Sequence, residues 1–325
     1  MDKRIVIIGG GTGLSVLLSG LKLMTSDLHA VVNVADDGGS SGVLREDLGM
    51  LPPGDIRACI LAMSNTPPLM EKLFGYRFDR GRFDGQSFGN LMIAALVEIT
   101  GSIEKAIGEA GNIFNMTGKV YPVTDEHIEL HGVLEDGTYI IGESKLPVIS
   151  IERASPIKSV NIYPSRPKTS ADVREVIETA DIIVVGPGSH FTSILPALLV
   201  SGVKESILRS KGKCIYIANM MSQPGETDNF TLRDYITSIY DHLEDPIFDG
   251  LIMNEKTLED HEIEAYRKQQ ATPLLMDIDD EIFLKDQGIV LKKGSYTNIS
   301  HGYIRHNAKR VARDIVALEK ELRLE

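Results

Sequence analysis

The stretch IVIIGGGTGLSVLL, residues 5–18, decides the fold class of this chain. Its first four residues are apolar and predict a buried strand, and the apolar spacing that follows predicts a helix over 14–24. Between them, Gly9 to Gly13 hold four glycines and one threonine. Because glycine loses the most backbone freedom on folding, such a run indicates a turn where the backbone must come close to something else.

The same alternation of apolar strand and helical segment recurs along the chain. Further strands are predicted at 30–35, 181–186, 213–218 and 249–254, with helices at 192–201, 231–243 and 258–269. Continuous apolar strands separated by helices are typical of a parallel sheet that is covered on both faces. The sequence therefore predicts an α/β protein with a Rossmann-like, doubly wound and mostly parallel sheet.

The pattern changes between about residues 119 and 165. The runs HIELHGVL (127–134) and TYIIGES (138–144), joined by EDG, predict an antiparallel hairpin, and VNIYP (160–164) predicts a further strand. No internal repeat, low-complexity tract or Ser/Gly linker sets this segment apart. We therefore expect a single domain over 1–325 with an inserted, β-rich antiparallel lobe at about 119–165.

Composition limits the classes of function. Lys and Arg number 34 against 46 Asp and Glu, and the resulting net charge of −12 argues against nucleic-acid binding. The sequence contains no signal-peptide pattern and no apolar stretch near the roughly 20 residues of a membrane span. Cys59 and Cys214 lie in apolar runs, as buried thiols do in a reduced compartment. We expect a cytoplasmic protein without stable membrane insertion.

Flexible and polar residues follow the predicted strands, where open parallel sheets bind ligands. The candidates for nucleotide binding are Gly10, Gly11, Thr12 and Gly13 after the first strand, Gly186, Gly188 and Ser189 after the strand at 181–186, and Asn219 after the strand at 213–218. A glycine turn that opens a helix presents unpaired N–H groups to an anion, so two such turns suit a diphosphate. A plain strand-to-helix turn is the alternative, because neither GxGxxG nor GxxxxGK[ST] occurs.

The segment ADDGGSSG (35–42) places two carboxylates at the end of the strand at 30–35. Asp36 and Asp37 there suit sugar hydroxyls, Mg²⁺ coordination or acid–base catalysis, and the alternative is a cap or turn. Small or polar neighbours complete the candidate site: Gly38, Ser40 and Ser41.

Cations and helix starts supply the other candidates. In LPPGDIR (51–57), Asp55 is predicted as a helix N-cap, and Arg57 lies in the first turn, where it opposes the helix dipole and suits an anion. SFGNL (87–91) opens a further helix that carries Asn90. Near the C-terminus, a basic segment holds Arg305, Lys309, Arg310 and Arg313, which either face a phosphate or form a solvated helix face.

These motifs together closely resemble the YvcK proteins, the gluconeogenesis factors of the CofD (2-phospho-L-lactate transferase) superfamily. The resemblance rests on IVIIGGGTGLSVLLSGLK, VNVADDGGSSGVLREDLGMLPPGDIR, SFGNL, GPGSHFTSILPALL, NMMSQPGET and GYIRHNAKRVA, which span nearly the whole chain. It implies a protein needed for cell shape and wall synthesis during gluconeogenic growth that binds UDP-sugars such as UDP-N-acetylglucosamine. By the same resemblance, Tyr266 in EAYRKQ and Arg305 in GYIRHN contact that ligand; a tyrosine suits stacking on uracil and an arginine suits the diphosphate.

Three functions remain open at this point. The favoured one is a nucleotide-sugar-binding regulator of wall precursor supply, with homo-oligomers and cell-wall synthesis partners left open. The second is a Mg²⁺-dependent, CofD-like transferase acting on a nucleotide-activated phospho-lactate-type substrate, for which Asp36 and Asp37 are the candidate catalytic and metal residues. The third is an NAD-dependent dehydrogenase, against which the missing GxGxxG counts.

Overall fold

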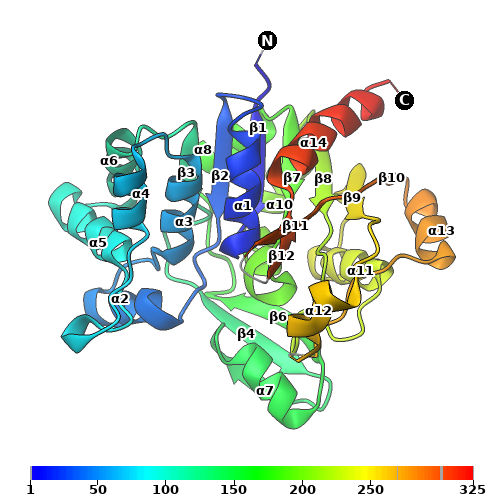
Figure 1. Ribbon diagram of the computed structural model, residues 1–325, viewed down its shortest axis with the longest axis horizontal. Helices are drawn as coiled ribbons and strands as arrows, with labels where there is room; N and C mark the ends of the chain where they lie inside the picture. Colours follow the sequence, from blue (N-terminus) through cyan, green and yellow to red (C-terminus); the bar gives the residue numbers. More distant parts are fainter. Residues whose placement is uncertain (1, 269, 301–302, 325) are drawn as a thin grey trace.

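The computed structural model describes residues 2–268, 270–300 and 303–324, and its centre is a seven-stranded parallel sheet (Figure 1). The strand order is β10-β9-β8-β7-β1-β2-β3. The strands are β1 (Ile5–Gly9), β2 (Leu28–Val32), β3 (Lys119–Pro122), β7 (Ile182–Val185), β8 (Lys213–Ile217), β9 (Gly250–Asn254) and β10 (Val290–Gly294). Each neighbouring pair is parallel, which confirms the predicted fold class.

The order of the strands reverses between β1 and β7. From β1 the chain continues through β2 to β3 on one side, and from β7 it continues through β8 and β9 to β10 on the other. β1, β2 and β7 are buried along their whole length, as their apolar sequences predict. A reversal of this kind opens a crevice beyond the carboxyl ends of the two central strands, where ligands of such sheets bind.

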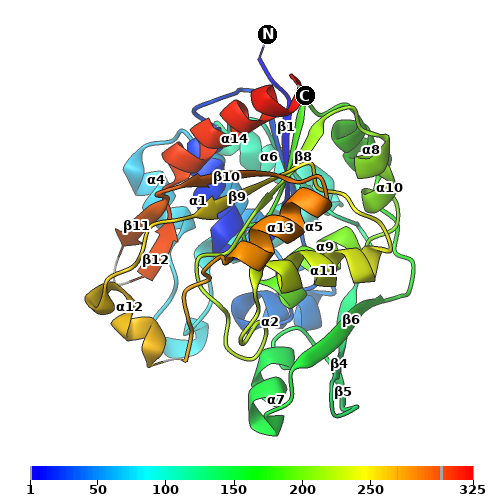
Figure 2. The same cartoon turned by 90° about the vertical axis from the view of Figure 1, so that its right-hand side faces the viewer.

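Helices cover both faces of the sheet. Figure 2 places α1 (Gly11–Leu21) and α14 (Ala308–Leu322) on one face and α8 (Ala171–Glu178), α9 (Leu195–Leu198), α10 (Val203–Arg209) and α11 (Leu232–Leu243) on the other. The remaining helices are α2 (Gly39–Leu48), α3 (Gly54–Met63), α4 (Pro68–Phe74), α5 (Phe88–Thr100), α6 (Ile103–Ile113), α7 (Leu146–Arg153), α12 (Asp260–Arg267) and α13 (Ile278–Asp286).

Several helices differ in extent from the sequence prediction. The helix expected at 14–24 is α1, which begins at Gly11 because the glycine turn itself is already helical. The helix expected at 192–201 begins as a π-helical turn, His190–Ile194, that continues into α9. In the part of the chain that the structure describes, no helix combines the length and the apolar character that a membrane crossing needs.

The predicted lobe is a three-stranded antiparallel sheet of order β5-β4-β6, with α7 after its hairpin. Its strands are β4 (Glu129–Leu134), β5 (Tyr139–Ile141) and β6 (Ile157–Tyr163), so the predicted hairpin is confirmed. The predicted start at about 119 is wrong, because residues 119–122 form β3 at the edge of the main sheet. Pro122 suits an edge strand, since it has no N–H to donate to a further strand.

A short antiparallel pair, β11 (Thr297–Ser300) and β12 (Tyr303–His306), precedes α14. The pair carries the C-terminal helix back across the molecule, where α14 packs on α1. Gly20 of α1 permits this contact, because a Cβ there would lie 2.3 Å from the carbonyl oxygen of Ala308. Through this packing, β12 lies next to the start of α1 and the crevice.

Candidate functional site

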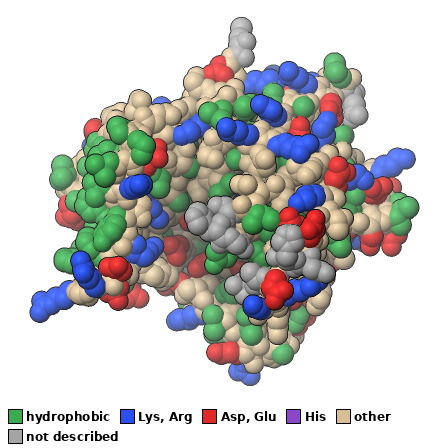
Figure 3. Space-filling model, in the orientation of Figure 1, with side chains coloured by type: hydrophobic (Ala, Val, Ile, Leu, Met, Phe, Trp, Pro, Cys, Tyr) green, Lys and Arg blue, Asp and Glu red, His purple; other side chains and the backbone are tan. Residues whose placement is uncertain are grey.

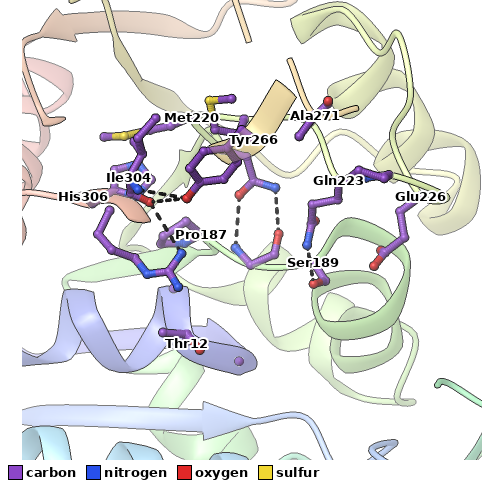
Figure 4. A pocket seen from close by; sticks show the side chains of 18 of the residues that line it. Thr12, Pro187, Ser189, Met220, Gln223, Glu226, Tyr266, Ala271, Ile304 and His306 are labelled. Carbon is purple, nitrogen blue, oxygen red and sulfur yellow. Dashed lines mark hydrogen bonds between the residues drawn. The ribbon is translucent and has the colours of Figure 1, made fainter. Parts of the chain in front are cut away.

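A cavity of about 510 Å³ lies beyond the carboxyl ends of β1, β7 and β8 (Figure 4). This volume is within the roughly 300–1,000 Å³ of small-molecule sites. Eight of the predicted residues line it: Gly11, Thr12, Gly13, Gly188, Ser189, Asn219, Tyr266 and Arg305. The structure therefore brings together side chains and turns that are almost 300 residues apart in the sequence, which we call the cavity site.

The two glycine turns of the cavity site contact each other. A Cβ on Gly13 would lie 2.7 Å from the carbonyl oxygen of Pro187, so the first turn requires glycine to pack on the second. Asn219 holds the second turn: its Oδ1 accepts from the N–H of Gly188 (3.3 Å), and its Nδ2 donates to the carbonyl of Gly188 (2.8 Å). Asn219 therefore positions a turn of the cavity wall.

Tyr266 and Arg305 form the opposite wall. The Tyr266 hydroxyl accepts from the N–H of Ile304 (2.9 Å) and donates to its carbonyl (3.2 Å), which fixes α12 to β12. The Arg305 guanidinium lies 5.1 Å from the ring centroid of Tyr303. Across the described ranges 2–268, 270–300 and 303–324, Arg305 makes no salt bridge. A cation without a carboxylate partner thus lines the cavity.

The rest of the basic segment lies elsewhere. Lys309, Arg310 and Arg313 are exposed on α14, where Figure 3 shows Lys and Arg gathered at the upper right. One guanidinium nitrogen of Arg310 donates to the carbonyl of Ser295 (2.9 Å). Of these four basic residues, all within the described ranges, Arg305 alone lines the cavity. Lys309, Arg310 and Arg313 thus lie on an exposed helix face, and a phosphate-facing role stays a prediction for Arg305.

The predicted aspartate pair lies beside the cavity, in a group that we call the acidic crevice: Asp36, Asp37, Asp55 and Glu143. Asp36 accepts from the N–H of Gly38 (2.9 Å). The two oxygens of Asp37 accept from the N–H groups of Glu143 (3.0 Å) and Ser144 (2.9 Å). Asp37 therefore joins the loop after β2 to the lobe.

Asp55 connects the acidic crevice to the first glycine turn. Its Oδ2 accepts from the N–H of Gly11 (2.7 Å), and a Cβ on Gly10 would lie 2.6 Å from the same oxygen. Burial raises the pKa of Asp55 to about 6, and the charge of Asp36 adds to this rise, while the bond from Gly11 opposes it. The predicted N-cap role is wrong, since Pro53 is the N-cap residue of α3.

Two further acids were not found by sequence reasoning. Burial raises the pKa of Glu143 to about 8 and that of Glu226 to about 7. Glu226 accepts from the N–H of Phe191 (3.1 Å) and the hydroxyl of Thr192 (3.3 Å). Glu226 is part of NMMSQPGET, a segment already placed after a strand; nothing local in the sequence marks Glu143.

The other predicted residues form a hydrogen-bonded group away from the cavity lining. Ser40 donates to Gln86 (2.9 Å) and accepts from the side chain of Asn90 (3.2 Å), and the Nε of Arg57 donates to Asn90 (2.9 Å). Ser41 accepts from the N–H of Gly54 (3.1 Å). Gly186 is separate from this group and follows β7 directly, with a positive φ of 77°. Arg57 therefore holds the start of α5 in this structure.

The acidic crevice, as it is arranged here, does not fit a magnesium ion. Both oxygens of Asp37 accept main-chain N–H groups, and one oxygen of Asp36 does the same. Among the described residues, no three His, Cys, Asp or Glu side chains are grouped closely enough to hold a metal. Mg²⁺ prefers several oxygen ligands in octahedral geometry, so a metal here would need these carboxylates to release their present donors.

Comparison with known families matches residues 5–293 to 2-phospho-L-lactate transferase CofD. The chain belongs to the CofD family. It is 41% identical over 315 residues to the gluconeogenesis factor of Halalkalibacterium halodurans, covering 97% of this chain and 96% of the relative. It is 40% identical over 319 residues to the gluconeogenesis factor of Bacillus subtilis, covering 98% of each.

A solved structure agrees with this assignment. The crystal structure of an upf0052 family member from Bacillus halodurans has a TM-score of 0.92 and 41% identity, and the match covers 97% of this chain and 100% of that one. The resemblance to the gluconeogenesis factors within the CofD family is thereby confirmed.

Proposed function

We propose that the protein binds a nucleotide sugar of the UDP-N-acetylglucosamine type in the cavity site and acts as a regulator. The observation that carries this proposal is Arg305, which has no salt-bridge partner in the described ranges and lines the same cavity as Gly11 to Gly13. In a chain of net charge −12, a lone guanidinium beside a helix N-terminus favours an anion locally. The guanidinium group of Arg305 can donate two parallel hydrogen bonds to a phosphate, which suits this residue to a diphosphate ligand.

The first turn of α1 supplies donors to the same anion. The N–H groups at the start of a helix have no partner within the helix. Here the N–H of Gly11 donates to Asp55, so the N–H groups of Thr12 and Gly13, which line the cavity, are the donors proposed for the anion. The dipole of the 11-residue helix α1 adds to the attraction. A diphosphate between this turn and Arg305 would place a base near Tyr266.

The regulatory part of the proposal rests on the relatives. Two of them at about 40% identity are named gluconeogenesis factors. A nucleotide sugar is built from hexose phosphate and is consumed in wall synthesis, so its concentration reports on carbon supply. We therefore assign the protein a role in cell shape and wall precursor supply during gluconeogenic growth, exerted through a cell-wall synthesis partner.

A transferase of the CofD type is the second candidate. The family match over residues 5–293 favours it, and so does the position of the acidic crevice against the first glycine turn. It would act on a nucleotide-activated phospho-lactate-type substrate with Mg²⁺, and Asp36 and Asp37 would have to exchange their present main-chain donors for the metal. This requirement makes it the weaker candidate.

Isothermal titration with UDP-N-acetylglucosamine, with and without Mg²⁺, tests the proposal, with GDP and NADH as competitors. Metal-independent binding of the UDP-sugar, with the ligand recovered unchanged, supports the regulator. Binding of GDP alone and only with Mg²⁺, or slow consumption of the ligand, contradicts it and supports the transferase. Tight binding of NADH would support the dehydrogenase that the missing fingerprint disfavours.

A further inference from the structure

One end of the cavity carries polar groups that a diphosphate does not use. Figure 4 shows Gln223, Ser189 and Glu226 on the side away from Tyr266. The Nε2 of Gln223 donates to the hydroxyl of Ser189 (2.6 Å). Its Oε1 is buried and has no hydrogen-bond partner within the described part of the chain. A buried acceptor without a donor costs free energy, so this amide lacks a partner that a ligand can supply.

Either orientation of the Gln223 amide leaves one of its polar atoms without a partner in the described part of the chain. If its nitrogen and oxygen were exchanged, the Ser189 hydroxyl would donate to the oxygen, and the NH₂ group would lack an acceptor instead. A hydroxyl group both donates and accepts, so it satisfies either orientation. An acetamido N–H satisfies the orientation observed here.

The loop that carries Gln223 is held rigidly. The N–H of Gln223 donates to the hydroxyl of Thr227 (2.9 Å), which also accepts from the hydroxyl of Tyr235 (2.8 Å). The N–H groups of Glu226 and Thr227 both donate to the Gln223 carbonyl (2.9 Å each). The amide is therefore positioned before a ligand arrives, which lowers the entropy cost of binding.

The charge of this end selects against a phosphate. Of the residues that line the cavity, Arg305 and Glu226 are the charged ones, and burial lowers the pKa of the lining His306 to about 4, which keeps that ring neutral. Glu226 is 7% exposed, and its carboxyl group accepts from the N–H of Phe191. A carboxyl group beside an amide suits hydroxyl groups in either protonation state, and the fraction that is ionised, with the pKa of Glu226 raised to about 7 by burial, repels a second anion.

The lobe closes this end of the cavity. Pro147 of α7 lines it, and a Cβ on Gly225 would lie 2.3 Å from the Pro147 carbonyl oxygen, so the lobe and the loop after β8 are in main-chain contact. Glu226 at this end is therefore buried, while Ser189 and Gln223 are half-buried and line the cavity, where a ligand can reach them.

We infer that Ser189, Gln223 and Glu226 form a sugar subsite, in which Gln223 is the specificity-determining residue and binds a hydroxyl or acetamido group of the pyranose. The inference rests on the proposed function, because it takes the diphosphate to lie between Arg305 and the first turn of α1. It adds recognition of the sugar, the part of the ligand by which a nucleotide sugar differs from the free nucleotide.

The test compares UDP, UDP-glucose and UDP-N-acetylglucosamine by calorimetry on the wild type, on Gln223→Leu and on Arg305→Ala. Gln223→Leu removes both polar atoms at similar volume, so we expect it to weaken the binding of UDP-N-acetylglucosamine by about tenfold and the binding of UDP by less than about twofold. Arg305→Ala should weaken the binding of all three ligands by the same factor. Gln223→Asn, which keeps an amide in the same loop, gives the same selective loss if the leucine variant does not fold.

The outcomes separate the two proposals. If the wild type binds neither UDP nor the UDP-sugars, the proposed function fails. If it binds both kinds of ligand and the ratio of their affinities is unchanged in the Gln223 variants, the sugar subsite alone is overturned. A selective loss of sugar affinity in those variants supports both.

Discussion

The cavity site and the acidic crevice lie side by side at the same edge of the sheet, yet their polar groups are used in opposite ways. In the cavity site, Arg305 has no salt-bridge partner in the described ranges and Gln223 has an acceptor without a donor. In the acidic crevice, Asp37 accepts two main-chain N–H groups and Asp55 accepts a third. The cavity site therefore has polar groups that can still bind a ligand, whereas the carboxylates of the acidic crevice already bind main-chain N–H groups of the protein.

A concentration of acids at a strand end is therefore not by itself a binding site. Asp36 and Asp37 are the more conspicuous in the sequence, but their present bonds hold the loop after β2 and the lobe in place. Arg305 is less conspicuous, and it is the residue that lines the cavity without a carboxylate partner in the described ranges. The comparison can be tested by exchanging residues of each region and measuring binding and stability separately.

The largest effect is expected for Arg305→Ala. Removing a charge-assisted hydrogen bond to a phosphate costs about 1.5 to 3 kcal/mol, which weakens UDP-sugar binding by more than about tenfold. The melting temperature should change little, because Arg305 has no salt bridge to lose in the described structure, and its contacts there are the Tyr303 ring and a long hydrogen bond to the carbonyl of Ile304 (3.5 Å). Calorimetry and a thermal melt measure the two quantities. Arg313→Ala, which removes the same charge from the exposed face of α14, is the control. If Arg305→Ala binds the UDP-sugar with unchanged affinity, the assignment of Arg305 to the ligand-binding site is wrong.

Asp37→Ala should show the reverse pattern. It leaves the N–H groups of Glu143 and Ser144 without their acceptor, so we expect the free energy of unfolding to fall by about 2 kcal/mol. Binding of the UDP-sugar should change by less than about threefold, since Asp37 does not line the cavity. Asp37→Asn keeps one acceptor oxygen and should lose about half as much stability in urea unfolding. Complete loss of binding in the folded Asp37→Asn variant would contradict the assignment of stability to the acidic crevice and of ligand binding to the cavity site.

The parts of this structure that the sequence predicted correctly are those in which local pattern decides. The apolar runs of β1, β7, β8 and β9 were sufficient to locate four strands of the parallel sheet, and the motif EDG located the hairpin of the lobe. Lys119–Pro122 was misassigned because four residues are too few for periodicity to distinguish a parallel edge strand from the lobe that follows it.

The site was predictable only in part, because its electrostatics come from contacts between distant segments. Asp55 looks like a helix cap in its own segment, but its carboxylate lies against Gly11, 44 positions away. Glu143 has no local signal at all, and its raised pKa arises from burial and then from Asp36, 107 positions away. Arg305 and Tyr266 were assigned by resemblance, since spacing alone gives no reason to place them in one cavity.

A smaller effect on stability is expected for Glu143→Gln. The pKa of Glu143 is raised to about 8, above that of an unfolded glutamate, so its contribution to stability is present in acid and is lost as the pH rises toward 8. The variant should come closest to the wild type at pH 5 and should become progressively more stable than the wild type as the pH rises to 8. Thermal melts across this range measure the change, and Glu135→Gln, at an exposed position of the same lobe, is the control. An equal difference at both pH values would contradict the burial of a neutral carboxyl group.

The smallest effect concerns Asp55, where the two regions meet. Its carboxylate lies against the helix N-terminus that we assign to the diphosphate, so it repels that ligand when it is ionised. Its pKa of about 6 means that it is ionised at pH 8 and protonated at pH 5. Asp55→Asn should therefore bind the UDP-sugar about two- to threefold more tightly than the wild type at pH 8, and the ratio should approach one at pH 5. Weaker binding at both pH values would mean that Asp55 supports the ligand, and that the acidic crevice and the cavity site act as one.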